Sequence, residues 1–584
     1  MYYSRLKTVL PNMCLANKPI IIMGCVIIDG EKDRMARGFG RRSSFMLSMQ
    51  FFPGIFSFGS RKARGPLIAI FAFSLAFVPA AFCDVTLSPL FSDGAVLQRG
   101  QAVPVWGTAE PGEAVTVTIN GKKAAATAGA DGAWMLKLPS LVAGGPFEMV
   151  VKGKNLLVIH DVAVGEVWLA SGQSNMEFPL QTFTPGNPVY GPKAREVIAA
   201  VNDPLLRMFT VPKKAAPDEP VPNTSNSGSW KSAVPENVGK FSAVGYYYAA
   251  ELRRKLNVPV GIIHSTVGGT SAEAWTSRDA QETDPKLRGL LAYYDKLAAS
   301  YPADKKVYDE QTMPAYQAAV AEAKAEGKPE PKKPWPLKSP MDFNRPTTLF
   351  NGMISPLIPY GIKGVIWYQG EANGTQGIAY RRIFPTLIKD WRTRWNQGDF
   401  PFLYVQLPSF TALQKQPIEK GWTLLREAQL MTLSVANTGM ASAIDLADPE
   451  NPGELHPHNK AEVGRRLALI AFAQVYGEKV SSFSGPLCSN VQFAGNEARL
   501  SFTHVDGGLM AKGGKLAGFA IAGKDRKFVW AEARIDGDNI VASSSEVPEP
   551  TAVRYGWAMN PIGNLYNKEG LPASPFRTDF DAPE

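Results

Sequence analysis

A serine among small and polar residues is the first side chain of this sequence that could act as a nucleophile. Ser174 lies in the segment Gly172–Met176, just after the apolar run Glu166–Ala170. A serine at a strand-to-helix turn is exposed, and its own backbone N–H can stabilise a developing oxyanion. The segment lacks the G-x-S-x-G pattern, and a serine that only caps a helix is the structural alternative. Acyl transfer therefore requires that a base and further oxyanion donors accompany Ser174.

The general base must come from the five histidines of the chain. We predict His456 as this base, because it lies in a polar loop before a helical pattern, whereas His458 lies where that helix begins. A base of this kind needs a third group that fixes its tautomer, and Glu454 is the nearest acid. Two imidazoles without a clear third ligand make a weak metal site, so we expect no metal. The remaining candidates are alternative acids, Asp445 and Asp448, and histidines expected to be structural, His160, His264 and His504.

Two more polar turns follow predicted strands and could complete the site. Gly268 and Gly269 let the backbone approach a ligand and present N–H groups. Gln369 offers a side-chain amide donor at the end of another strand. Turn chemistry alone could explain each of these turns, but three of them at successive strand ends favour one shared site. We expect substrate contacts from residues in and beside these turns: Gln173, Asn175, Trp275, Glu371 and Asn373.

The elements that must position these side chains alternate between apolar strands and amphipathic helices. Predicted strands are Glu166–Ala170, Val258–Thr266, Gly364–Tyr368, Phe402–Leu407 and Met440–Ile444. Predicted helices are Val244–Lys255, Tyr380–Trp395, Thr423–Val435 and Ala461–Tyr476. Continuous apolar strands with intervening helices predict an α/β domain with a parallel sheet covered on both faces. Ligands of such sheets bind beyond the carboxyl ends of the strands, where the polar turns lie.

The pattern changes at both ends of this α/β domain, which we place at residues 161–477. Short alternating runs with Asn-Gly and Asp-Gly turns predict a β-sandwich at 84–160. Alternation returns at 478–584 and predicts a C-terminal β domain. An insertion at about 277–346, rich in Lys, Glu, Ala and Pro, predicts an exposed helical flap.

Residues 1–83 form a leader that explains the charge of the whole chain. The 584 residues include 62 Lys and Arg against 53 Asp and Glu, a formal charge of +9. The leader holds 11 of the basic and 3 of the acidic residues, so the remainder carries only +1. Basicity therefore gives no reason to expect a nucleic-acid partner. Three of the four cysteines also lie in the leader, which leaves no disulfide framework in the remainder.

The end of the leader has the features of a secretory signal at about 61–83. A basic start at Arg61 precedes the uncharged stretch Pro66–Cys83, with small residues Ala80 and Ala81 near its end. We predict export, to the periplasm or outside the cell, and no stable membrane association unless the signal stays uncleaved as an anchor.

The motifs taken together resemble the sialate O-acetylesterase family, a carbohydrate-esterase branch of the SGNH hydrolases. The motifs that carry the resemblance occur in the expected order: Gly172–Met176, Gly268–Thr270, Trp367–Asn373, His456-Pro457 and the tail Gly563–Pro572. The resemblance covers most of the chain beyond the leader, about 85–578. It implies a flavodoxin-like SGNH hydrolase domain, flanked by N- and C-terminal β domains, that removes O-acetyl groups from sugars without a cofactor.

The resemblance also implies roles for individual residues. Ser174 matches the nucleophile and His456 the base, and Gln369 stands where SGNH hydrolases generally use an Asn as oxyanion donor. The Ser174 N–H and the N–H of Gly268 or Gly269 would complete the oxyanion hole. Many SGNH enzymes place an Asp three residues before the His, where this sequence has Gly453. Glu454 can take that place, or a backbone carbonyl can orient His456.

Two other functions compete with a sialate esterase. An esterase for acetylated plant polysaccharide such as xylan would use the same machinery, whereas a sialate would favour an arginine near the site, for which Arg278, Arg345 and Arg554 are candidates. A non-catalytic carbohydrate-binding protein would instead use the aromatic residues Trp275, Trp367 and Tyr368. The sequence indicates no particular oligomeric state.

Overall fold

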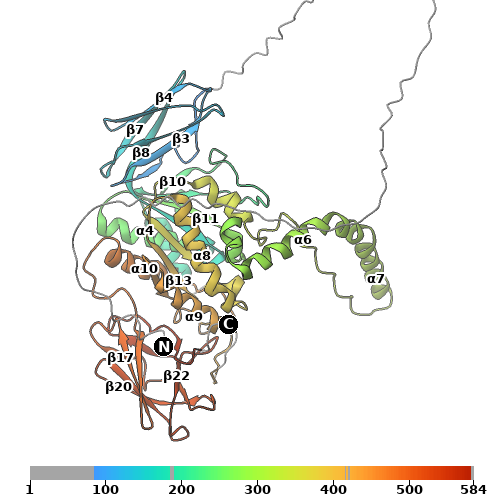
Figure 1. The fold of residues 1–584 in the computed structure, drawn as a ribbon, viewed down its shortest axis with the longest axis vertical. Helices are drawn as coiled ribbons and strands as arrows, with labels where there is room; N and C mark the ends of the chain where they lie inside the picture. The colour runs from blue at the N-terminus through green and yellow to red at the C-terminus, as the bar shows by residue number, and fades with distance from the viewer. Residues whose placement is uncertain (1–83, 184–189, 226, 415, 418–420, 581–584) are drawn as a thin grey trace, which may run out of the picture. The chain divides into compact units, whose positions relative to one another are not determined.

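The computed structural model of the protein describes residues 84–580, apart from 184–189, 226, 415 and 418–420. The predicted leader, with its signal at about 61–83, lies outside the described residues. In the part of the chain that is described, no helix is long and apolar enough to cross a membrane. Two β-rich segments flank a central α/β region (Figure 1).

The first β-rich segment consists of short strands, and burial alternates along two of them, Ala114–Ile119 and Ala133–Leu138. Asn120 and Gly121 both have positive φ, 44° and 71°, as a two-residue hairpin requires, and they join β4 to β5 in the predicted place. One sheet has the order β1-β3-β6, while β4, β5 and β7 join a second sheet. The strands are β1 (Thr86–Leu87), β2 (Val96–Gln98), β3 (Val103–Thr108), β4 (Ala114–Ile119), β5 (Lys122–Thr127), β6 (Ala133–Leu138) and β7 (Gly144–Lys152).

Strand β8 (Leu156–Gly172) runs from this segment into the α/β region without a break. Its first half pairs antiparallel with β7, and its second half pairs parallel with two strands of the central sheet. Burial along β8 changes where its pairing partners change: every residue from Val162 to Gly172 is buried, while the earlier residues are not. The predicted boundary between residues 160 and 161 thus falls inside one strand.

The central sheet has the order β10-β9-β11-β8-β12-β13-β14. All neighbours on this path are parallel except β10, which pairs antiparallel with β9. The α/β class is as predicted, but the sheet is mixed rather than purely parallel, and β9 and β10 were not predicted. The strands are β9 (Asp203–Thr210), β10 (Trp230–Ala233), β11 (Val260–Thr266), β12 (Gly364–Tyr368), β13 (Phe402–Gln406) and β14 (Thr438–Ser442).

Helices cover both faces of this sheet. Figure 1 shows α4 (Ala243–Leu256) and α10 (Lys460–Gln474) on one side and α8 (Gly377–Trp395) and α9 (Trp422–Met431) on the other. Local sequence sets the helix ends: the Ser242 side chain accepts from Gly245 N–H at 3.0 Å, and Asn257 ends α4 with a left-handed φ of 51°. The shorter helices are α1 (Ser174–Glu177), α2 (Tyr190–Ala200) and α3 (Pro235–Val238).

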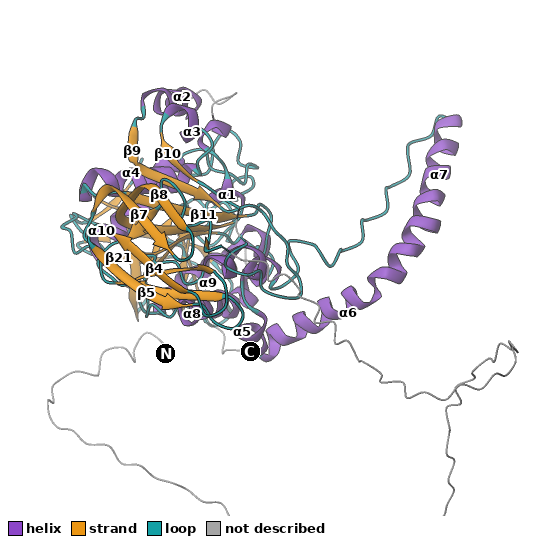
Figure 2. Ribbon diagram, turned by 90° about the horizontal axis from the view of Figure 1, so that it is seen from above, coloured by secondary structure: helices purple, strands orange, loops and turns teal. Residues whose placement is uncertain are grey.

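The predicted insertion is a helical arm with little buried surface. Helices α5 (Arg278–Glu282) and α6 (Pro285–Val307) are followed by a π-helical turn and α7 (Met313–Ala325). Figure 2 shows α6 and α7 leading away from the sheet. Only Leu287 and Leu291 of α6 are buried, and no residue of α7 is. The arm is exposed, as the composition of the insertion predicts.

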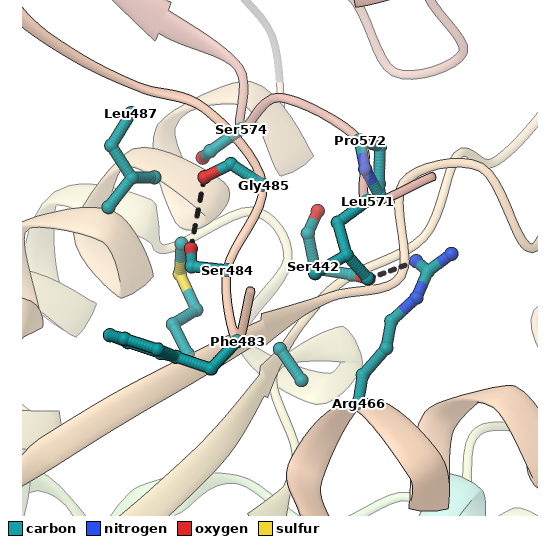
Figure 3. Close-up of a pocket in the computed structure, with 11 residues that line it drawn as sticks. Ser442, Arg466, Phe483, Ser484, Gly485, Leu487, Leu571, Pro572 and Ser574 are labelled. Carbon is teal, nitrogen blue, oxygen red and sulfur yellow. Dashed lines mark hydrogen bonds between the residues drawn. The ribbon is translucent and has the colours of Figure 1, made fainter. Parts of the chain in front are cut away.

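The C-terminal β domain has its own hydrophobic core, which is separate from that of the α/β region. Across the contact between them, Arg577 Nε donates to Glu427 Oε1 at 2.6 Å, with both residues buried. A small pocket of about 10 Å³ is lined by residues of both parts, among them Ser442 and Arg466 of the α/β region and Ser484 and Pro572 of the C-terminal domain (Figure 3). It has room for about one water molecule. The strands are β15 (Leu487–Ala494), β16 (Glu497–Thr503), β17 (Leu509–Ala511), β18 (Phe519–Ala522), β19 (Val529–Trp530), β20 (Glu532–Asp536), β21 (Asn539–Ser543), β22 (Ala552–Tyr555), β23 (Leu565–Asn567) and β24 (Phe576–Arg577).

Candidate active site

Ser174 is the first residue of α1 and lies directly beyond the carboxyl end of β8. The turn before it depends on Gly172, which has a φ of 133°. A Cβ at Gly172 would lie 2.2 Å from the backbone oxygen of Tyr368 on β12, so only glycine lets the two strands come this close. The turn leaves Ser174 partly exposed.

Ser174, His456 and Glu454 form a continuous chain of hydrogen bonds. The distance from Ser174 Oγ to His456 Nε2 is 3.0 Å, and His456 Nδ1 lies 2.7 Å from Glu454 Oε1. The same carboxylate oxygen accepts the backbone N–H of His456 at 2.9 Å. A serine, a base within hydrogen-bond reach and a carboxylate on the far ring nitrogen form the arrangement of a nucleophilic triad.

The loop that holds His456 is fixed from both sides. The ring of Phe178 meets the imidazole edge-on, with centroids 4.6 Å apart. Asn459 caps α10 by accepting from Glu462 N–H at 3.2 Å. The alternative acids have other partners: Asp445 pairs with Arg466, and Asp448 lies 3.6 Å from His458. Glu454 is thus the acid that contacts His456.

Burial lowers the pKa of His456 below its ordinary value of 6.5. The Glu454 carboxylate opposes this shift by its hydrogen bond, and the positive charge of Lys460 adds to it. The net direction keeps the imidazole neutral at neutral pH, and only the neutral ring can accept a proton from serine.

Gly268 is the glycine of the second turn that lies against Ser174. A Cβ on Gly268 would lie 3.5 Å from the Ser174 Cβ. The Gly268 N–H donates to the Glu177 carboxylate, which also forms an ion pair with Lys213. A negatively charged oxygen therefore already lies on this N–H without any substrate. At Gly269, the carbonyl accepts from Asn344 Nδ2 at 2.9 Å.

Gln369 does not offer the free donor that the sequence predicts. Its Nε2 donates to the Thr270 carbonyl at 3.0 Å and to Asn373 Oδ1 at 2.8 Å, while its Oε1 accepts from Tyr380 at 2.8 Å. The side chain is fully buried, and both amide protons have partners within the protein. These contacts give Gln369 a structural role, joining the second and third turns.

Asn175 joins three loops next to Ser174. Its Nδ2 donates to the Leu455 carbonyl at 3.1 Å, just before His456, and to Glu371 Oε1 at 2.5 Å. Its Oδ1 accepts from Lys460 Nζ. Burial lowers the pKa of Lys460 to about 7 and raises the pKa of Glu371. Asn175 and Glu371, expected to contact substrate, instead belong to a buried network behind the loop that holds His456.

Three other expected substrate contacts are also buried, with partners inside the protein. Gln173 Oε1 accepts the N–H of Ala372 at 3.1 Å. Trp275 is fully buried and donates to Thr270 Oγ1 at 3.0 Å, so its ring is no platform for a sugar. Asn373 Nδ2 donates to Glu273 Oε2 at 2.9 Å. Polar residues beside a nucleophile look alike in sequence whether they face a ligand or brace the turn, and here these three brace it.

The sequence analysis missed the roles of Glu177, Phe178, Lys213 and Lys460. Glu177 stands three residues after Ser174 on α1, so spacing along a helix was the available signal for it. Lys460 begins α10, four residues after His456. Lys213 gave no such signal. Among the described residues, no three His, Cys, Asp or Glu side chains are grouped so that they could hold a metal ion.

Comparison with known proteins identifies relatives along most of the chain. Residues 339–473 match the family model described as carbohydrate esterase, sialic acid-specific acetylesterase. Sialate O-acetylesterase from Homo sapiens is 30% identical over 524 residues, covering 82% of this chain and 90% of the human protein. The Mus musculus protein of the same name is 30% identical over 514 residues, with 81% and 90% covered.

A solved structure agrees with these relatives. The crystal structure of a carbohydrate acetylesterase from Xanthomonas citri matches with a TM-score of 0.70 and 39% identity, covering 85% of this chain and all of that one. These matches confirm the family inferred from the motifs around Ser174, Gln369 and His456. The chain belongs to the sialate O-acetylesterase family.

Proposed function

We propose that this protein is a carbohydrate O-acetylesterase that hydrolyses acetyl esters on sugars through an acetyl-serine intermediate. The observation that carries the proposal is the hydrogen-bonded chain from Ser174 through His456 to Glu454. Relatives named sialate O-acetylesterase make O-acetylated sialic acid the first substrate to test.

The fold proposed for the catalytic domain is the flavodoxin-like fold of SGNH hydrolases. Without β9 and β10, the strand order β11-β8-β12-β13-β14 follows the flavodoxin-like pattern 2-1-3-4-5. In that pattern the crevice lies beside the first strand, here β8, and Ser174 comes directly after it. We further propose that the leader directs export to the periplasm or beyond and that the β-rich segments are separate domains.

In the first half of the reaction, His456 takes the proton of Ser174 Oγ while that oxygen attacks the acetyl carbonyl carbon. Glu454 stabilises the imidazolium that results. His456 then gives the proton to the sugar oxygen, so the C–O bond breaks and the sugar leaves as an alcohol. In the second half, water gives a proton to His456 while its oxygen attacks the acetyl carbon. His456 then returns this proton to Ser174 Oγ as the bond between that oxygen and the acetyl carbon breaks, which releases acetic acid and restores Ser174.

Two backbone donors are proposed for the oxyanion, the N–H of Ser174 and that of Gly268. Each fixed donor of this kind is worth roughly 3 kcal/mol of barrier. The Glu177 carboxylate, which now accepts from Gly268, occupies the place of the acetyl oxygen and has to turn away when an ester binds. Its ion pair with Lys213 gives the carboxylate a second partner after that movement.

Arginines that could bind a sialate carboxylate already have acidic partners. Arg278 pairs with Asp295, and Arg554 pairs with Asp579 in the C-terminal domain. Arg345 lies between Asp218 and Asp295. Because these arginines are paired with carboxylates, the second candidate is an esterase for an uncharged acetylated polysaccharide such as acetylxylan.

A substrate panel tests the proposal. Acetate release is measured with O-acetylated sialic acid and, separately, with acetylated xylan, and Ser174→Ala serves as the control. We expect release from the sialic acid ester by the wild type only. Equal or faster release from xylan would favour the second candidate. Binding of either sugar without acetate release would instead indicate a non-catalytic carbohydrate-binding protein.

A further inference from the structure

A polar cavity of about 270 Å³ lies between the helical insertion and the α/β region. Its walls come from α5 and α6 of the insertion, from Pro217–Pro220, and from the segment between Arg345 and Asn351. Ligand cavities typically begin near this size, at about 300 Å³. None of the residues assigned to acetyl transfer lines this cavity.

Two segments connect the walls of the cavity to the turns around Ser174. Asn344, which donates to the Gly269 carbonyl at 2.9 Å and accepts from the Ser271 N–H at 2.9 Å, immediately precedes the lining residue Arg345. On the other wall, Pro217 follows Lys213 by four residues, and Lys213 forms an ion pair with Glu177. Both walls are therefore anchored to the turns that surround Ser174.

Asn351 is a buried polar side chain that lacks a partner in the part of the chain described. It is 4% exposed, and no hydrogen bond reaches its amide. Neither amide atom is among the fully enclosed unpartnered atoms, so the amide is open to the cavity that the residue lines. An amide offers both donors and an acceptor, so the hydroxyl groups of a ligand can hydrogen-bond to it.

Arg345 presents a guanidinium whose present contacts are long. Its side chain is 10% exposed and reaches Asp218 at 3.4 Å, the Pro340 carbonyl at 3.5 Å and Asp295 at 3.8 Å. Charge-assisted hydrogen bonds normally lie near 2.7–2.9 Å. The two carboxylates balance the charge of the guanidinium, but their long contacts leave N–H groups that can donate to the hydroxyl groups of an uncharged ligand.

Backbone strain marks the same wall of the cavity. Thr347 has a φ of 74°, which is rare for a β-branched residue, and its N–H donates to the Glu273 carbonyl at 3.0 Å. Conformations of this kind persist where the surroundings impose them, and they concentrate at ligand sites. Thr347 lies between Arg345 and Asn351 in the chain, and all three residues line the same wall of the cavity.

The charge balance of the lining selects the kind of ligand. Five carboxylates and three guanidiniums line the cavity: Asp218, Glu219, Asp279, Glu282 and Asp295, with Arg278, Arg345 and Arg394. This net negative lining disfavours an anionic ligand. An uncharged ring with many hydroxyl groups matches a wall of alternating donors and acceptors.

We propose that this cavity is a subsite for an uncharged sugar unit next to the acetylated one in a glycan, held by Arg345 and Asn351. The subsite rests on the proposed function, because it positions a longer substrate for attack by Ser174. It adds affinity for oligosaccharides and leaves small acetyl esters unaffected.

Steady-state kinetics of Asn351→Ala and Arg345→Gln test the subsite with three probes: O-acetylated sialyllactose, acetylated xylo-oligosaccharide and para-nitrophenyl acetate. We expect KM for whichever oligosaccharide is hydrolysed to rise about tenfold or more, while kcat/KM for the small ester stays at the wild-type value. Asn496→Ala, at an exposed position of the C-terminal domain, is the matched control and should change nothing.

Two results would overturn the subsite while leaving the proposed function intact: an unchanged KM for a hydrolysed oligosaccharide, or an equal loss with the small ester. The proposed function fails differently, because the wild type would then hydrolyse the small ester and neither oligosaccharide. The subsite would fall with it. Because Arg345 is largely buried, Asn351→Ala decides the outcome if Arg345→Gln does not fold.

Discussion

One oxygen of Glu454 accepts from His456 twice, from the ring nitrogen Nδ1 at 2.7 Å and from the backbone N–H at 2.9 Å. The pair is only two residues apart in the chain, so the loop itself sets the orientation of the imidazole. The resemblance to SGNH hydrolases leads us to expect an Asp three residues before the His, where this chain has Gly453. A longer side chain at a shorter spacing reaches the same ring nitrogen here.

Replacing this carboxylate should disable the base. We predict that Glu454→Ala lowers kcat by roughly 10²- to 10⁴-fold with little change in KM, because the imidazolium loses its stabilising charge. The measurement is acetate release under saturating and subsaturating ester. Glu450→Ala removes an exposed acid of the same loop and should retain full activity. Wild-type rates in Glu454→Ala would assign the orientation of His456 to another group.

The pH dependence should follow the neutral form of His456. Its pKa lies below 6.5, so activity is full at neutral pH and falls as the pH drops through that lowered value. The positive charge of Lys460 lowers the pKa of His456, so removing that charge should raise the pKa of His456. We therefore predict that Lys460→Met moves the acid limb of the kcat/KM profile to higher pH.

The control for this shift is Lys389→Met, at an exposed position of α8. It should leave the profile in place. If Lys460→Met instead lowers the maximum of kcat/KM and leaves the acid limb at the same pH, Lys460 only holds the loop through Asn175 and does not affect the pKa of His456.

Glu177 should compete with the substrate for the Gly268 N–H. We predict that Glu177→Ala raises kcat/KM for a small acetyl ester by roughly 3- to 10-fold. A charge-assisted hydrogen bond worth about 1.5–3 kcal/mol sets the upper limit. Initial rates of para-nitrophenyl acetate hydrolysis provide the measurement. A fall in kcat/KM, with the fold intact by circular dichroism, would mean that Glu177 supports the turn.

The buried pair of Arg577 and Glu427 should hold the C-terminal β domain to the α/β region. Glu427 also accepts from Arg381, so its removal leaves two arginines without their carboxylate. We predict that Glu427→Ala lowers the free energy of unfolding by about 3–5 kcal/mol. Denaturant titration measures this loss, and Glu497→Ala, within an exposed ion pair, should cost about 1 kcal/mol or less. Equal costs would contradict the bridging role of Glu427.

Much of the fold was predictable because the buried strands carry their own signal. Gly364–Tyr368 is apolar throughout and became β12 with unchanged bounds, and β8 ends where the small residues begin. β9 and β10 escaped prediction because their burial is partial and interrupted by polar residues. β8 crosses a predicted boundary because one strand can serve two sheets.

The residues that form the site could be predicted from their places just after strands and in the loop before α10. Ser174, His456 and Glu454 meet because strand ends gather at one edge of a sheet. The orientation of amide side chains was not predictable, since Gln369 and Asn175 can each face a ligand or a neighbouring loop. Only the positions of Thr270, Leu455 and Lys460 decide between these two orientations.

Acetate release from an O-acetylated sugar by Ser174→Ala, set against the wild type at equal protein concentration, tests the central claim most directly. Both proteins are first shown to unfold with the same midpoint. We predict that the substitution lowers kcat by about 10⁵-fold or more, because alanine has no oxygen that could form the acetyl intermediate. Retention of even a tenth of the wild-type rate would show that Ser174 is not the nucleophile.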